Sequence, residues 1–303
     1  MTYCLQADET YESGLRRIAY EQISYVLDCL QKPGDEPDEA IHEARKSFKK
    51  MRALLRLVRD ELSEDVYRRE NICFRDAGRH LALTRDSLVM FETLAELKQK
   101  HDDNLAATTF THAQDILAKS HELLLAEAFA PHQSVDQVIG MMEEARERIA
   151  EWPLEAGTFA AIAPSLRRVY KRGYRGRQRT KKRATAENLH EWRKRVKYLW
   201  YGLRLLCPLW PKLLATVAAE VDELAGYLGH DHDLAVLGKW AEKQPSLFPN
   251  EFELLMGLIQ QERHQLQMQA MPLGQRIYAE KPKQFVKRMA RYGQVWAASE
   301  EIR

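Results

Sequence analysis

Two segments of the chain carry the same pattern of basic side chains. The first, here called the N-terminal stripe, consists of His42, Arg45, Lys46, Lys49 and Arg56. The second, the C-terminal stripe, consists of His190, Arg193, Lys194, Lys197 and Arg204. At about 100° per residue each set falls on one face of a helix, and at about 1.5 Å per residue it spans roughly 21 Å. Guanidinium and ammonium groups match phosphate oxygens, and histidine adds a titratable donor, so the pattern favours binding of a polymeric anion.

The alternative interpretation of each stripe is an ordinary solvated helix face. A solvated face usually interleaves both signs of charge at i, i+4, whereas neither stripe contains an acidic residue. Like charges at that spacing mildly destabilise a helix, so the arrangement is unfavourable unless an anion binds. Because the stripe also occurs twice, we expect binding.

A third basic segment runs from Leu166 to Arg183. It contains ten Lys and Arg residues and no acidic residue, which is typical of an anion-binding element or a self-repelling linker. Leu166, Val169 and Tyr170 have helical spacing, so we expect at least its first part to be an ordered helix. A weaker basic pair lies near the N-terminus, and one further arginine neighbours the N-terminal stripe. With this segment they supply the further candidate binding residues Arg16, Arg17, Arg52, Arg167, Arg168, Lys171, Arg172 and Arg175.

The expected fold class is all-α. Apolar residues recur three and four positions apart, whereas signals for strands and hairpins are nearly absent. One apolar seam consists of Ile41, Ala44, Phe48, Met51, Leu55, Val58 and Leu62. Its counterpart consists of Leu189, Trp192, Val196, Leu199, Leu203, Leu206 and Trp210. We expect both seams to lie in the core.

The stripes belong to a longer internal repeat. Blocks before and after them also recur in the same order and at nearly the same offset, as for Leu81–Asp86 and Leu228–Asp233. The repeat predicts two homologous helical halves, residues 8–150 and 158–300, with the junction at Glu151–Gly157.

The doubled His-x-x-Arg-Lys-x-x-Lys helix, each copy followed by a Leu-x-x-x-Arg/His-Asp element, resembles the CHAD family (conserved histidine α-helical domain). The resemblance covers about residues 8–300, and we expect one CHAD-type domain over residues 1–303. It implies two four-helix bundles related by a pseudo-twofold axis, with a basic central groove or pore. It also implies that the stripes bind inorganic polyphosphate and that the protein associates with polyphosphate granules.

The two halves differ at some of the matched positions. Lys50 and Arg52 correspond to Tyr198 and Trp200, so the halves need not contribute equally to binding. The run His230–Asp233 holds metal-ligand residue types, but four consecutive residues of a helix point in different directions, so we expect no metal site. We expect Asp86 and Asp233 to orient a neighbouring Arg or Lys, or to cap a helix.

The sequence gives little support for catalysis. It contains no P-loop and no G-x-S-x-G motif, and it lacks the Glu-x-Glu-x-Lys signature of the triphosphate-hydrolysing tunnel domain found in some multidomain relatives. We therefore expect a non-catalytic protein without a cofactor that binds long-chain inorganic polyphosphate. A metal-dependent polyphosphate or triphosphate hydrolase is a less favoured alternative.

Nucleic acid is the strongest rival ligand, because cationic stripes also neutralise its phosphates. Against it stands the net charge of only +2, from 46 Lys and Arg and 44 Asp and Glu. Base stacking needs exposed aromatic side chains, for which the candidates are Tyr170, Tyr174, Tyr198 and Tyr201.

The sequence shows no apolar run of about 18 residues and no signal peptide. The four cysteines are scattered and form no C-x-x-C pair, so we expect small buried apolar residues in a reducing compartment. These features predict a cytoplasmic protein that does not enter a membrane.

Overall fold

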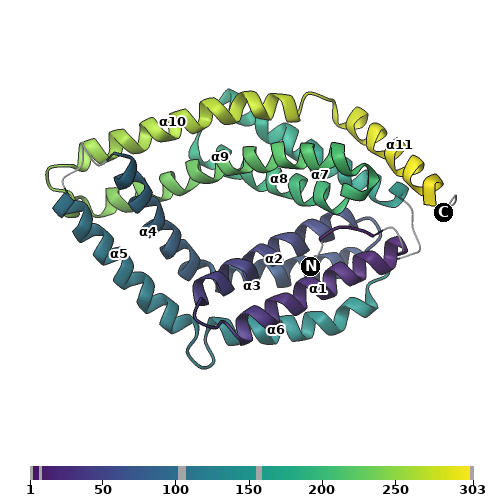
Figure 1. The fold of residues 1–303 in the computed structure, drawn as a ribbon, viewed down its shortest axis with the longest axis horizontal. Helices are drawn as coiled ribbons and strands as arrows, with labels where there is room; N and C mark the ends of the chain where they lie inside the picture. The colour runs from purple at the N-terminus through teal and green to yellow at the C-terminus, as the bar shows by residue number, and fades with distance from the viewer. Residues whose placement is uncertain (1–2, 7–8, 102–106, 155–158, 301–303) are drawn as a thin grey trace.

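The computed structural model describes residues 3–6, 9–101, 107–154 and 159–300. Within these ranges the chain forms helices and no strand (Figure 1). The α-helices are α1 (Tyr11–Gln31), α2 (Pro37–Leu57), α3 (Glu64–His80), α4 (Ala82–Lys100), α5 (Ala107–Ala128), α6 (Ser134–Arg148), α7 (Phe159–Lys182), α8 (Ala186–Leu205), α9 (Pro211–Lys243), α10 (Phe252–Ile277) and α11 (Pro282–Glu300). Short 3-10 helices cover Ile149–Glu151, Cys207–Leu209 and Pro245–Leu247. The all-α fold class is confirmed, and no described helix is both long and apolar enough to span a bilayer.

Helices pack mainly against others of the same half. α1, α2, α3 and α6 pack together in the first half, and α7, α8, α9 and α11 do so in the second, where α10 also runs along α9. The main core includes residues from both groups, because α2 packs against α7 and α8. Figure 1 shows α4 and α5 as an arm on the left that reaches toward α9 and α10.

A second, smaller core joins that arm to the other half. Leu94 of α4 and Phe110 of α5 are fully buried together with Leu237 of α9 and Leu255 of α10. The aromatic rings of Phe110 and Phe248 lie 5.7 Å apart in the same cluster. The two halves therefore contact each other at two places, and this second contact holds α4 beside α9.

The predicted apolar seams are confirmed at all positions but one. The seven residues of the first seam are buried, although α2 ends at Leu57, so Val58 and Leu62 belong to the segment that follows it. In the second seam the prediction for Trp210 is wrong, because this side chain is 49% exposed. Its neighbours Pro208 and Pro211 explain the difference, since α8 ends at Leu205 and the chain turns away from the helical register before Trp210.

The basic segment forms an ordered helix over nearly its whole length. The prediction of an ordered first part is confirmed. The helix extends beyond that part, because α7 continues to Lys182. Gly173 permits this packing, because the hydroxyl and ring of Tyr278 occupy the space in which a Cβ would lie. Gly176 similarly lies against Trp192 of α8. Positive charge is therefore carried on a helix that is fixed by close contacts on its other side.

The halves predicted at residues 8–150 and 158–300 leave a junction that lies partly outside the described residues. Residues 149–151 form a 3-10 turn, and Trp152 and Leu154 are buried in the main core. All four cysteines carry free thiols, and each is partly exposed. The expectation that the cysteines are buried is therefore wrong.

Candidate functional site

The packing of α2 against α8 brings the two stripes into one region of the molecule. Lys49 of α2 is within electrostatic reach of Arg193 and Lys197 of α8. Lys197 in turn is within reach of Lys46. The central residues of the N-terminal stripe therefore lie beside the central residues of the C-terminal stripe.

Arg45 is held in place by groups from two other helices. Its Nη1 donates to the backbone carbonyl of Gly78 at 2.7 Å, and its Nη2 donates to Asp86 Oδ1 at 3.4 Å. The prediction that Asp86 orients a basic residue is thus confirmed. Among the described residues the buried Arg45 Nε has no hydrogen-bond partner, so one buried donor of this guanidinium is unsatisfied.

Arg193 occupies the matching position on α8. Its guanidinium lies against Gly229 of α9, where a Cβ would come within 3.3 Å of Nη2. Its Nε is buried and, in the described part of the chain, lacks an acceptor. Asp233 lies within electrostatic reach of Arg193, and burial raises the pKa of the Asp233 carboxyl. Glycine at position 229 therefore lets this arginine approach α9 closely.

Carboxylates form ion pairs with several lysines of the stripes. The expectation from sequence was that no acidic residue opposes these charges. Lys46 pairs with Glu43 at 2.6 Å, and Lys194 pairs with Glu191. Both carboxylates lie three residues before the lysine, at the edge of the stripe. Lys197 Nζ pairs with Asp222 of α9 at 3.2 Å and lies 4.2 Å from the centre of the Trp200 ring.

Lys49 differs from the other three lysines. No ion pair or hydrogen bond joins its ammonium to another described residue. The side chain keeps solvent-exposed area although protein surrounds it on most sides. This enclosure, together with the charges of Arg45, Arg193 and Lys197, lowers the pKa of Lys49 to about 7.

Arg85 of α4 adds a cation that the stripes do not contain. The charge of Arg85 lowers the pKa of both Lys49 and His42. Arg85 also forms an ion pair with Glu92 at 3.5 Å. A cavity of about 400 Å³ begins beside it, between α4, α9 and α10. Glu96 and Glu262 also line this cavity, so its interior is less favourable for an anion than the stripes are. The repeat of the Leu81–Asp86 block was the sequence signal that could have identified Arg85.

The histidines lie near these cations and are kept neutral by burial. The rings of His190 and His232 are 4.0 Å apart. Desolvation and the charges of Lys194 and Arg193 lower the pKa of His190, and desolvation with His190 lowers that of His232 to about 3. Desolvation and Arg85 likewise lower the pKa of His42.

The far end of the N-terminal stripe enters a second arginine cluster. Arg56 stacks on the ring of Tyr198 at 4.0 Å, and its Nη1 donates to the carbonyl of Arg52. The pocket there is lined by Arg56, Arg59, Tyr67, Ser165, Arg168, Val169, Arg172, Arg195 and Tyr198. Arg168 and Arg172 of α7 were predicted, whereas Arg59, Tyr67 and Arg195 were not. The missed residues gave no signal through the repeat, because their contact depends on how α2, α3, α7 and α8 pack.

The remaining candidates of α7 differ in exposure. Arg168 pairs with Asp60, which leaves it partly neutralised. Arg167, Lys171 and Arg175 are exposed at four-residue intervals, so they lie along one outer face of α7. At the end of α8, Arg204 lies 5.1 Å from the ring centre of Trp200.

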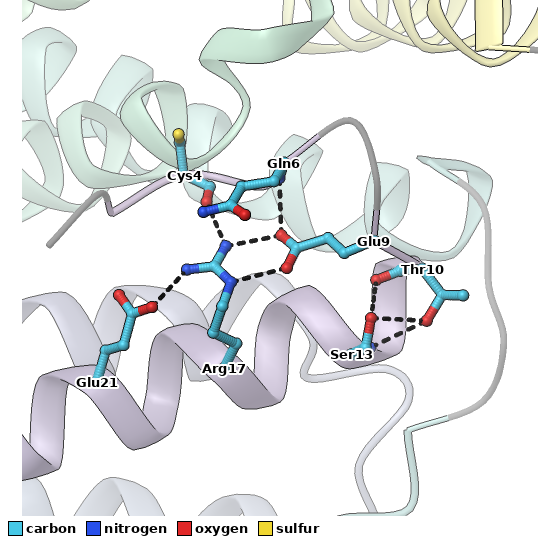
Figure 2. Close-up of polar contacts among 7 residues, drawn as sticks. All are labelled: Cys4, Gln6, Glu9, Thr10, Ser13, Arg17 and Glu21. Carbon is cyan, nitrogen blue, oxygen red and sulfur yellow. Dashed lines mark hydrogen bonds and ion pairs between the residues drawn. The ribbon is translucent and has the colours of Figure 1, made fainter. Parts of the chain in front are cut away.

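Arg16 and Arg17 are already bonded to other groups of the chain. Arg16 donates to backbone carbonyls of Ile149 and Trp152. Figure 2 shows that Arg17 is bonded to Glu9, Glu21 and the carbonyl of Cys4. Both guanidiniums therefore fasten segments of the chain, because carboxylates and carbonyls occupy their donors.

The run from His230 to Asp233 does not converge on one point. Asp231 is buried and accepts from Arg263 and Gln267 of α10, whereas Asp233 lies near Arg193. In the described ranges no three His, Cys, Asp or Glu side chains gather in a way that could hold a metal ion.

These features define an all-helical protein with a cluster of cations where two halves of the chain meet. The family model described as CHAD domain matches residues 17–242. The chain therefore belongs to the CHAD family. No curated protein matches the sequence.

Proposed function

We propose that the protein binds long-chain inorganic polyphosphate without catalysis, through the two stripes and Arg85. CHAD domains are associated with polyphosphate binding. One observation carries the proposal for this chain: the stripes share a region in which Lys49 has no carboxylate partner among the described residues and is within electrostatic reach of Arg45, Arg193, Lys197 and Arg85. Excess positive charge of this kind is relieved when a polyanion binds.

The carboxylates beside the stripes do not oppose this function. The Lys46–Glu43 and Lys194–Glu191 pairs are partly exposed, and such pairs contribute only about 0–1 kcal/mol. A phosphate chain with many charges can replace Glu43 or Glu191 at little cost. Binding should therefore weaken with ionic strength and strengthen with chain length.

We further propose that the halves 8–150 and 158–300 are related by a pseudo-twofold axis and that the phosphate chain lies in a groove between them. The packing of α2 against α8 supports this arrangement. Association with polyphosphate granules would follow from such binding.

Nucleic acid is less well supported as a ligand. Tyr170 and Tyr201 are buried, and Tyr174 and Tyr198 are partly buried against the core. Tyr198 is also covered by Arg56. These four rings are therefore poor platforms for stacking bases.

Titration with polyphosphates of defined length tests the proposal. The expected result is tighter binding to long chains than to tripolyphosphate, and displacement of RNA by polyphosphate at fixed ionic strength. Tighter binding of RNA would favour the nucleic-acid alternative. Release of phosphate in the presence of Mg²⁺ or Mn²⁺ would instead indicate a hydrolase.

A further inference from the structure

The segment 3–6 near the start of the chain, here called the strap, contacts both halves of the molecule. The backbone N–H of Leu5 donates to the carbonyl of Leu205 at 3.3 Å. This carbonyl lies in the last turn of α8, where the helix itself supplies no donor. The hydroxyl of Tyr3 donates to the carbonyl of Lys50 on α2 at 2.9 Å. The strap therefore joins α2 and α8, the two helices whose packing brings the stripes together.

Two cysteines flank the bond between the strap and α8. Cys4 directly precedes Leu5, and Cys207 follows Leu205 by two residues, at the start of a 3-10 helix. The N–H of Leu5 occupies the place of a donor from the next helical turn, so Cys4 lies beside the residues that follow α8. Covalent geometry on each side of this bond keeps the two cysteine Cα atoms within about 10 Å of each other.

The two thiols are also neighbours of each other. Both are free and partly exposed. Arg17 donates to the carbonyl of Cys4 at 2.9 Å, and Figure 2 shows the Sγ of Cys4 on the opposite side of the strap from this guanidinium. Burial raises the pKa of the Cys4 thiol, and among the nearby charges Cys207 has a larger effect than Arg17. The strap therefore places the thiol of Cys4 close to that of Cys207.

We propose that Cys4 and Cys207 form a reversible disulfide by exchange with small-molecule disulfides such as oxidised glutathione. The thiolate of one cysteine attacks a sulfur of the small disulfide, forms a mixed disulfide and releases one small thiolate. The thiolate of the second cysteine then attacks the sulfur of the first cysteine and releases the second small thiolate. Two protein thiols are oxidised, one small disulfide is reduced to two thiols, and the two protons pass from the protein thiols to these products.

The disulfide would tie the strap covalently to the end of α8. It would close a loop of about 200 residues that contains both stripes. Because a link across a long loop restricts the unfolded chain, the oxidised protein should resist unfolding better than the reduced protein. This modification does not depend on polyphosphate binding, since both reacting groups belong to the chain and the oxidant is a small molecule.

The test is equilibration of the full chain in mixtures of reduced and oxidised glutathione, once in native buffer and once in urea. Alkylation of the remaining thiols and peptide mapping by mass spectrometry then measure each product. The equilibrium constant for the Cys4–Cys207 disulfide should be about 100-fold greater in native buffer, because folding holds the two thiols together. A ratio below about threefold, or glutathione adducts as the main native products at Cys4 and Cys207, would overturn the proposal.

The other two cysteines serve as references within the same molecule. Cys29 lies beside Tyr25 on α1, and Cys73 lies beside Arg148. Both thiols are partly exposed like those of the proposed pair, so exchange should give mixed glutathione disulfides at these two positions. A disulfide between Cys29 or Cys73 and either member of the pair, formed in native buffer at comparable yield, would contradict the specific pairing.

A second experiment measures urea unfolding of the oxidised and reduced protein. Oxidation should raise the urea midpoint of the native sequence and of the matched control Cys29→Ser. In Cys207→Ser the midpoint should not rise, because Cys4 can then form only a mixed disulfide. An equal rise in Cys207→Ser would show that the gain does not come from the link between the strap and α8.

Discussion

At the scale of single residues, the two halves compensate their lysines in the same way. Glu43 precedes Lys46 by three positions, as Glu191 precedes Lys194. Each carboxylate holds its lysine at the edge of the stripe and leaves the next lysine along the helix to other partners. In the second half Asp222 fills that role for Lys197, whereas Lys49 has none among the described residues. The halves are thus unequal in charge where they meet.

Replacing Lys49 by glutamine is expected to stabilise the folded chain, by on the order of 1 kcal/mol at pH 6 after allowance for solvent screening. The folded pKa is about 7, and the unfolded value is about 10.4. Between these values the unfolded chain holds the extra proton, so the stability of the native protein rises with pH. The difference in unfolding free energy between Lys49→Gln and the native protein should be largest below pH 7 and fade toward pH 10.

Denaturant unfolding of both proteins at pH 6, 8 and 10 measures this difference. Lys46→Gln is the matched control, because Lys46 already has a carboxylate partner, and its effect should not stabilise the protein at pH 6. Destabilisation by Lys49→Gln at pH 6 would show that the Lys49 charge is compensated.

At the scale of elements, close approach of α7 to its neighbours fixes the basic helix. Gly173 lies against the fully buried Tyr278, with no room for a Cβ between them. Gly173→Ala should lower the unfolding free energy by about 1–3 kcal/mol, because the clash must be relieved by shifts of buried groups. Thermal and denaturant unfolding measure the loss. Gly140→Ala, at a helical glycine with open space around it, should not destabilise, and equal effects of the two substitutions would refute the packing argument.

The elements were the part of the structure best predicted from sequence, because helical periodicity is local. The buried seam around Phe48 and the first part of α7 follow from spacing, whereas the continuation of α7 through Gly173 and Gly176 to Lys182 does not. The prediction that Trp210 is buried is wrong because a proline on each side of it ends the helical register of α8. For Arg16 and Arg17, charge alone does not reveal that Glu9 and backbone carbonyls accept hydrogen bonds from their guanidiniums.

At the scale of the whole molecule, the meeting of the two stripes depends on contacts between distant segments. Sequence spacing placed Arg45 and Arg193 on their own helices, but their shared region results from the packing of α2 against α8. The second core, around Phe110 and Phe248, places Arg85 of α4 beside the same region. A repeat could indicate two like halves, but it could not give the contact between them.

Binding of polyphosphate should be coupled to proton uptake. The cationic surroundings and burial lower the pKa of Lys49, His42 and His190, and a bound polyanion would raise all three. Affinity should therefore fall as pH rises from 6 to 9, with uptake of about one proton near pH 7.5. Calorimetric titrations in buffers of different ionisation enthalpy measure the uptake. No uptake, or affinity that increases with pH, would contradict the coupling.

The most direct test of the binding site is a titration of the Arg45→Ala and Arg193→Ala double variant with long-chain polyphosphate. Affinity should fall about 100-fold, because each charge-assisted contact contributes on the order of 1.5 kcal/mol and about 1.4 kcal/mol corresponds to tenfold. The control is Arg146→Ala with Arg276→Ala, which removes the same charge from exposed positions on α6 and α10 and should change affinity by less than about threefold. Equal affinity of the two double variants, both shown to be folded by circular dichroism, would contradict the site.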